Sequence, residues 1–177
     1  MDSYLEKARA AIEDATGQLP VERIARQIPG KWSVAQILEH LTLTFNLNAS
    51  ALERAIASGE TKAGRTGLVN TASRVVVVDL GYFPRARAPE AVVPRGSIAP
   101  EHSREAIAEA LAAVDSALAR AAERFGLATP LLKHAFFGGM TVPQWRKFHF
   151  RHTVHHMRQV GERVALPSLR TRSMLRR

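Results

Sequence analysis

Apolar residues recur at steps of three and four over long stretches of this 177-residue chain. The clearest stretch is residues 101–125. Its apolar side chains form one stripe: Ile107, Leu111, Val114, Leu118 and Phe125. This spacing matches the 3.6-residue turn of an α-helix, and such a stripe is normally buried against other helices. The pattern therefore predicts an all-α fold.

Polar residues and turn formers mark the ends of the expected helices. Ser33 and Gln36 fit a capping box, in which the hydroxyl and the amide each bond a free backbone N–H group. Thr141 is expected to cap the last long helix, with Pro143 in its first turn. The expected elements are a first helix from Asp2 or Ser3 to about Gly17, a short turn over 20–28, and long helices over 33–59, 101–125 and 142–164.

The connections between the middle helices are long. Residues 67–82 contain RVVVVDL, whose β-branched content is typical of a buried strand. No other segment offers a strand to pair with it, so we expect a helix or an irregular packing segment there. Residues 83–100 contain four prolines and predict an extended connection, and residues 126–142 predict a second one. With no paired strands expected, the predicted architecture is a four-helix bundle.

Composition and charge narrow the classes of protein. Hydrophobic residues make up 46% and charged residues 23%, as in ordinary soluble domains. No stretch is long and apolar enough to span a membrane, and the N-terminus does not resemble a secretory signal, so a cytoplasmic protein is expected. The net charge is +9, and four of the excess positive charges lie in the tail, residues 167–177, which follows one expected domain over residues 1–166. Binding of nucleic acid is not expected, because the aromatic-rich basic strands of single-strand binders are absent.

Histidines provide the most chemically specific pattern. Four of the seven lie in the last helix: His149, His152, His155 and His156. His152 and His156 are four residues apart, so their imidazoles lie one turn apart on one face and can share a metal ion. Because the chain has no cysteine, further ligands must be nitrogen or oxygen donors. His40, mid-helix among apolar residues, is the candidate third ligand.

Each histidine also has a simpler interpretation. His40 alone fits a core histidine bonded to a carbonyl group, and most pairs spaced by four residues have no metal. The helical wheel places His149 in the same sector as His152 and His156, and turns His155 to the side, near Phe148. His149 is either a second-shell base or additional ligand, or a core residue beneath Trp145.

Two motifs carry a resemblance to a known family. KWSVAQILEHL, residues 31–41, and HTVHHMRQV, residues 152–160, resemble the two signatures of the DinB-like superfamily. The longer stretch FFGGMTVPQWRKFHFRHTVHHMRQV is especially similar to a branch of unknown function. In two places the chain departs from the usual pattern: Gln36 stands where many members have an acid, and no glycine precedes Gln159.

The resemblance implies both a fold and a metal site. Members of the superfamily are four-helix bundles, commonly homodimers, related to bacillithiol- and mycothiol-dependent transferases and to metal-dependent hydrolases. Their three histidines bind zinc, nickel or a similar ion, and they correspond here to His40, His152 and His156. Zinc or nickel is the expected ion, with iron and manganese as alternatives.

The expected function is therefore a metal-dependent hydrolase or a transferase acting on a small molecule with a low-molecular-weight thiol. Two alternatives stay open. One is a non-catalytic, stress-associated protein that binds a metal or small ligand, and the other is an interaction protein that binds anions or nucleic acid through its basic tail. Three arginines of the long connection either bind a carboxylate or are simply exposed: Arg85, Arg87 and Arg95.

Overall fold

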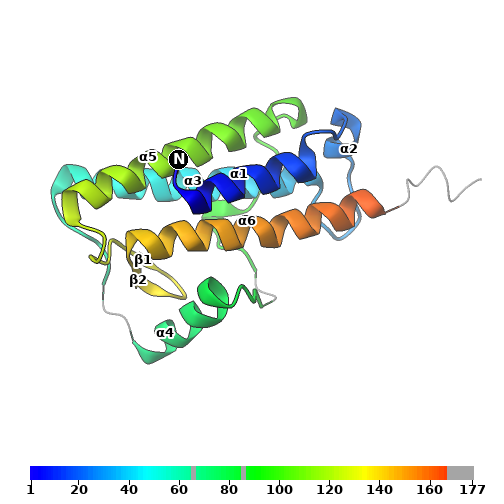
Figure 1. The fold of residues 1–177 in the computed structure, drawn as a ribbon. Helices are drawn as coiled ribbons and strands as arrows, with labels where there is room; N and C mark the ends of the chain where they lie inside the picture. Colours follow the sequence, from blue (N-terminus) through cyan, green and yellow to red (C-terminus); the bar gives the residue numbers. More distant parts are fainter. Residues whose placement is uncertain (65–66, 85–86, 167–177) are drawn as a thin grey trace, which may run out of the picture.

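The protein is mostly helical in a computed structural model that describes residues 1–64, 67–84 and 87–166. Its four longest helices are α1 (Ser3–Thr16), α3 (Val34–Ser58), α5 (Ser103–Phe125) and α6 (Val142–Ala165). They lie side by side, with α3 packed along α5 and α1 along α6, while α3 also contacts α6 (Figure 1). The expected helical fold class is confirmed.

Helix boundaries follow the capping residues. The Ser33 hydroxyl accepts a hydrogen bond from the Gln36 N–H at 3.2 Å, and the Gln36 side-chain oxygen accepts one from the Ser33 N–H at 2.9 Å. The predicted capping box of α3 is therefore present. At the start of α1, the Asp2 carboxylate accepts from the Tyr4 N–H at 2.9 Å. These contacts satisfy backbone donors that a helix cannot satisfy internally.

The core lies between the long helices. The stripe predicted on α5 faces inward, since Ile107, Leu111, Val114 and Leu118 are fully buried. Phe125, at the end of the same stripe, is partly buried and packs against the core. The α3 side of the core is built from a matching apolar set, which includes Ile37, Leu38, Leu41, Phe45 and Leu52.

The connection between α3 and α5 holds short helical elements. The segment with four valines is helical, as expected: α4 (Leu68–Arg74) continues into the π-helical turn η1 (Val75–Asp79). Val77 and Val78 are buried, and η1 packs against α6. Figure 1 shows α4 to one side of the long helices. The same connection contains the turns η2 (Glu90–Val92) and η3 (Pro100–His102), while the short helix α2 (Val21–Ala25) lies between α1 and α3.

The expectation that no strands pair is wrong. Strands β1 (Leu132–His134) and β2 (Gly138–Met140) form a small antiparallel hairpin within the second connection. Gly138 takes a positive φ of 67° at the turn, which a glycine adopts without strain. Lys62 adds backbone hydrogen bonds to Leu131 and Lys133 at 2.7 and 2.9 Å. Strands of three residues are too short to show an alternating pattern in the sequence.

The last expectations concern membrane spans and the basic tail. No helix in the described ranges is both long and apolar enough to cross a bilayer. The basic tail, residues 167–177, and Arg85 lie outside the described residues.

Candidate metal centre

Three histidines from two helices meet at one point. His40 comes from the middle of α3, and His152 and His156 come from successive turns of α6. The Nε2 atom of His152 lies 3.0 Å from Nε2 of His156 and 3.4 Å from Nε2 of His40. One nitrogen from each ring lies within 4.8 Å of the others, a grouping able to hold a metal ion. The structure thus brings together the three residues that the sequence singled out.

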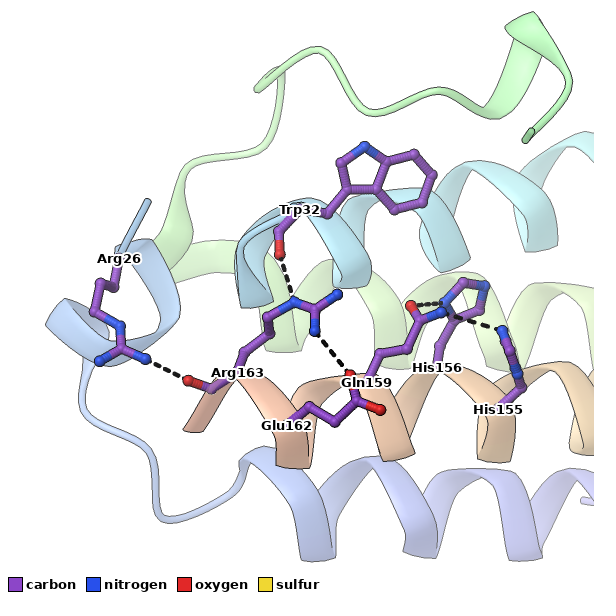
Figure 2. A network of polar contacts seen from close by, with 7 residues as sticks. All are labelled: Arg26, Trp32, His155, His156, Gln159, Glu162 and Arg163. Carbon is purple, nitrogen blue, oxygen red and sulfur yellow. Dashed lines mark hydrogen bonds and ion pairs between the residues drawn. The ribbon is translucent and has the colours of Figure 1, made fainter. Parts of the chain in front are cut away.

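The hydrogen bonds of two rings leave their Nε2 lone pairs free. The Nδ1–H group of His40 donates to the carbonyl oxygen of Val92 at 2.7 Å. The Nδ1–H group of His156 donates to the side-chain oxygen of Gln159 at 3.0 Å (Figure 2). With its proton held on Nδ1, each ring presents Nε2 as an electron-pair donor toward the other histidines. This tautomer is the one that a metal bound through Nε2 requires.

The spacing of the nitrogens fits a shared ion. Two nitrogens each ~2.1 Å from one ion are about 3.0 Å apart at an angle of 90° and about 3.4 Å apart at the tetrahedral angle. The two separations from His152 Nε2, 3.0 Å to His156 and 3.4 Å to His40, match these values. Hydrogen bonds between the rings explain these short separations less well. His152 Nε2 carries at most one proton, which cannot be donated well to both His40 and His156. His40, His152 and His156 therefore fit a metal ion by distance and by protonation state.

Burial keeps the cluster uncharged. Burial lowers the pKa of His156 to about 3, with the His40 ring acting in the same direction. Burial also lowers the pKa of His40 and, together with the neighbouring histidines, takes that of His152 well below its ordinary value. His40 and His156 are buried, while His152 is partly exposed. Neutral imidazoles are the form that binds metal, so little proton loss opposes binding at neutral pH.

Glu39 has a structural role beside the cluster. Its carboxylate accepts hydrogen bonds from the backbone N–H groups of Arg95, Gly96 and Ser97 at 2.9–3.2 Å and from the Ser97 hydroxyl at 2.6 Å. Burial alone raises the pKa of Glu39, but these hydrogen bonds outweigh it and lower the pKa overall. The acid next to His40 therefore anchors the loop that follows Val92, whose carbonyl orients His40.

The other two histidines of α6 take different positions. His149 is fully buried against Phe45 and Trp145, with ring centroids 5.3 and 5.8 Å away, and it is not part of the cluster. This placement supports the interpretation of His149 as a core residue. His155 stacks on Phe83 at 4.8 Å and not on Phe148, which instead stacks on His152 at 5.3 Å. Phe83, from the long connection, therefore supplies the ring that packs on His155, a contact that the helical wheel of α6 alone does not predict.

A large cleft opens beside the cluster. Its volume is about 1640 Å³, and His40, His152, His155 and His156 all line it. Of the predicted anion-binding arginines, Arg87 lines this cleft, whereas Arg95 is exposed and pairs with Glu90 at 3.5 Å. A cavity of this size beside convergent polar groups is the usual form of a small-molecule site.

Some functional residues were not predicted from the sequence. Gln159 accepts from His156 and also donates its amide to Nε2 of His155 at 3.1 Å (Figure 2). Gln159 belongs to the motif HTVHHMRQV and lies one turn after His155, so its position in the motif could have indicated its contact with the histidines. The Val92 carbonyl left no such signal, because any residue supplies a backbone carbonyl. His134 of β1, which lines the cleft, sits in a hairpin that the sequence did not predict.

Contacts at the end of α6 hold the two histidine-bearing helices together. The Nε–H group of Arg163 donates to the carbonyl oxygen of Trp32, just ahead of α3, at 3.1 Å. Arg26 in turn donates to the carbonyl oxygen of Arg163 (Figure 2). These contacts fix the C-terminal turn of α6 against the residues that precede α3.

Comparison with known proteins agrees with this geometry. The model of the DinB superfamily matches residues 4–160. Neither curated proteins nor solved structures contain a match to the chain. The matched range includes all three clustered histidines and most of the chain. The chain therefore belongs to the DinB superfamily.

Proposed function

We propose that this protein is a metal-dependent enzyme in which His40, His152 and His156 hold one divalent ion. The convergence of their Nε2 atoms at separations of 3.0 and 3.4 Å carries this proposal. Zinc and nickel suit a set of three imidazoles, and iron or manganese are the alternatives. Three protein ligands leave a coordination position for water or substrate, as in catalytic zinc sites.

The cleft favours thiol transfer over hydrolysis. When bound, the ion would lower the pKa of a coordinated thiol or water molecule. No aspartate or glutamate is among the described residues that line the cleft, so a carboxylate base for activating water is missing from that lining. A free thiol has a pKa of about 8.5 against about 15.7 for bulk water, so it needs far less help to ionise.

The reaction proposed is transfer of a small electrophilic molecule onto a thiol. The chain has no cysteine, so the thiol belongs to a low-molecular-weight cosubstrate. The thiol sulfur forms a bond to the electrophilic carbon, the bond from that carbon to its leaving group breaks, and the thiol proton passes to solvent. Metal-dependent hydrolysis is the second candidate, because water can occupy the same coordination position as the thiol.

Two features implied by the family resemblance remain proposals. The arrangement of α1, α3, α5 and α6 is proposed to be the four-helix bundle of DinB-like proteins. The protein is proposed to form a homodimer in the cytoplasm, and sedimentation of the purified chain measures its mass directly.

An activity screen tests the proposed reaction. Protein loaded separately with zinc, nickel, iron and manganese is assayed for conjugation of small thiols to electrophiles and for ester and amide hydrolysis. His152→Ala serves as the matched variant lacking one ligand, and Leu127→Ala, at an exposed position in the turn after α5, serves as the control. Conjugation by the loaded protein that His152→Ala loses supports the proposal. Equal rates in both variants contradict it.

A further inference from the structure

The charged residues that line the cleft are all basic. In the part of the chain that the structure describes they are Lys31, Arg54, Lys62, Arg87, Lys133 and Arg163. The whole chain has 25 basic and 16 acidic residues, so a cleft lined without bias would include acidic side chains. A cavity lined by one sign of charge concentrates ligands of the opposite sign.

Most of these charges are not neutralised by a neighbour. Lys62 pairs with Glu60 at 3.3 Å, and Arg163 pairs with Glu162 at 3.0 Å. The other four basic side chains have no ion-pair partner within the described ranges. The excess positive charge is therefore available to a ligand.

Arg163 is the best placed of the six. It is 8% exposed, and its Nε and one terminal nitrogen are used by Trp32 and Glu162. The remaining nitrogen, Nη2, makes no hydrogen bond to a described residue. Figure 2 shows the guanidinium beside Trp32 on the same side of α6 as the His156 ring. Arg163 follows His156 by seven residues, or two turns of α6, so their backbone positions differ by a rise of about 10 Å along the helix.

Lys31 extends the same end of the cleft. It is exposed, lines the cleft, and precedes Trp32, the residue whose carbonyl Arg163 binds. The cleft is also lined by aromatic side chains, namely those of Trp32, Phe83, Phe137, Trp145 and Phe148. The lining thus combines an apolar wall with a cationic end close to the histidine cluster.

We infer that Lys31 and Arg163 form an anion-binding subsite, and that the substrate has an apolar body with a carboxylate or phosphate that reaches this subsite while its reacting atom lies at the histidines. This inference rests on the proposed function for the position of the reacting atom. Lys31 supplies the unpaired positive charge of the subsite. Arg163, whose charge is shared with Glu162, supplies direction through its remaining nitrogen, because a guanidinium binds planar or tetrahedral oxyanions through directed hydrogen bonds.

Calorimetry with a matched ligand set tests the subsite. The probes are 2-naphthylacetate, 2-naphthyl phosphate and the uncharged 2-naphthylacetamide, which share one aromatic body. At least one anion is expected to bind ten-fold or more tightly than the amide, with a preference that falls as salt is raised. The tighter of the two anions identifies the class of substrate.

Variants separate the subsite from general charge. Lys31→Gln and Arg163→Gln are expected to reduce the anion preference several-fold, and Arg163→Lys to retain part of it. Lys7→Gln, an exposed change on α1 outside the cleft, makes the same change in net charge and is the control. Equal binding of acid and amide, or an equal effect of Lys7→Gln, overturns the inference. Lys31→Gln keeps the test valid if Arg163→Gln fails to fold.

His152→Ala distinguishes this inference from the metal proposal. A preference for the anion that persists in His152→Ala places the anion at the basic end of the cleft, whether or not the histidines bind metal. A preference that disappears in that variant places the anion at the histidines and overturns the subsite. Metal content, measured on the same samples, reports separately on the proposed metal centre.

Discussion

His40 donates its Nδ1 proton to the carbonyl oxygen of Val92 across 2.7 Å, linking helix α3 to the long connection between α3 and α5. This contact fixes both the tautomer and the rotation of the ring. The Nε2 atom consequently faces His152 on α6. The position of a proposed metal ligand therefore depends on a loop that contributes no side chain to the cluster.

Removing the Glu39 charge should loosen that loop. Glu39→Gln removes the charge from four hydrogen bonds to residues 95–97, and we expect a loss of about 2 kcal/mol in unfolding free energy. Metal affinity should fall with it, because Val92 would hold His40 less firmly. Chemical denaturation and chelator competition measure the two effects.

Glu53→Gln is the matched control for this change. Glu53 lies on the same helix but pairs with Arg120 at a more exposed position, where an ion pair contributes little to stability. We expect a change below about 0.5 kcal/mol. An equal effect of the two substitutions would mean that Glu39 does not act through the loop.

Gln159 should tune metal affinity without binding metal. Gln159→Leu removes the acceptor for His156 Nδ1–H and the donor to His155, so we expect a loss of 10–100-fold in metal affinity. Gln159→Glu keeps the acceptor and should retain most of the affinity. Chelator competition on both variants gives the comparison. A Gln159→Leu protein with unchanged affinity would refute this role.

Acid should destabilise the fold through His149. Burial, with a smaller contribution from His134, lowers the pKa of His149 to about 3, against 6.5 for an exposed histidine. The unfolded chain thus binds a proton between these values that the folded chain does not. Above pH 6.5 neither state binds this proton, and the unfolding free energy has its full value; it falls as the pH drops from 6.5 toward 3. Between pH 7 and pH 4 the loss in unfolding free energy is about 3 kcal/mol.

Denaturation at a series of pH values with chelator present measures this dependence. His149→Leu keeps an apolar side chain of similar size and should show a shallower fall in unfolding free energy toward acid. His102→Leu, at an exposed position, should follow the parent protein. A parent profile that His149→Leu leaves unchanged would assign the acid sensitivity to other groups.

The sequence predicted the long helices because each buries an apolar stripe, and because α1, α3 and α6 also begin at a recognisable cap. It also predicted the pairing of His152 and His156, since helix geometry alone places residues four apart on one face. The choice of His40 as their neighbour needed the packing of α3 on α6, which the sequence suggests only through the family resemblance.

What the sequence did not predict depends on contacts between distant segments. The hairpin of β1 and β2 is stabilised by Lys62, about 70 residues earlier in the chain than β1, and its strands are too short for a periodic signal. Phe83, from the long connection, stacks on His155, a contact that the pattern of α6 alone could not predict. The sequence pattern gives directions around one helix and cannot say which residue of another segment lies there.

The metal content of the untagged protein tests the central claim most directly. Elemental analysis after purification and exchange with each candidate ion should find about one ion per chain in the parent protein and in Leu127→Ala. His40→Ala, His152→Ala and His156→Ala should each lose most of it while keeping the parent helical content by circular dichroism. Equal metal content in the parent and the three folded variants would contradict a metal centre built from these histidines.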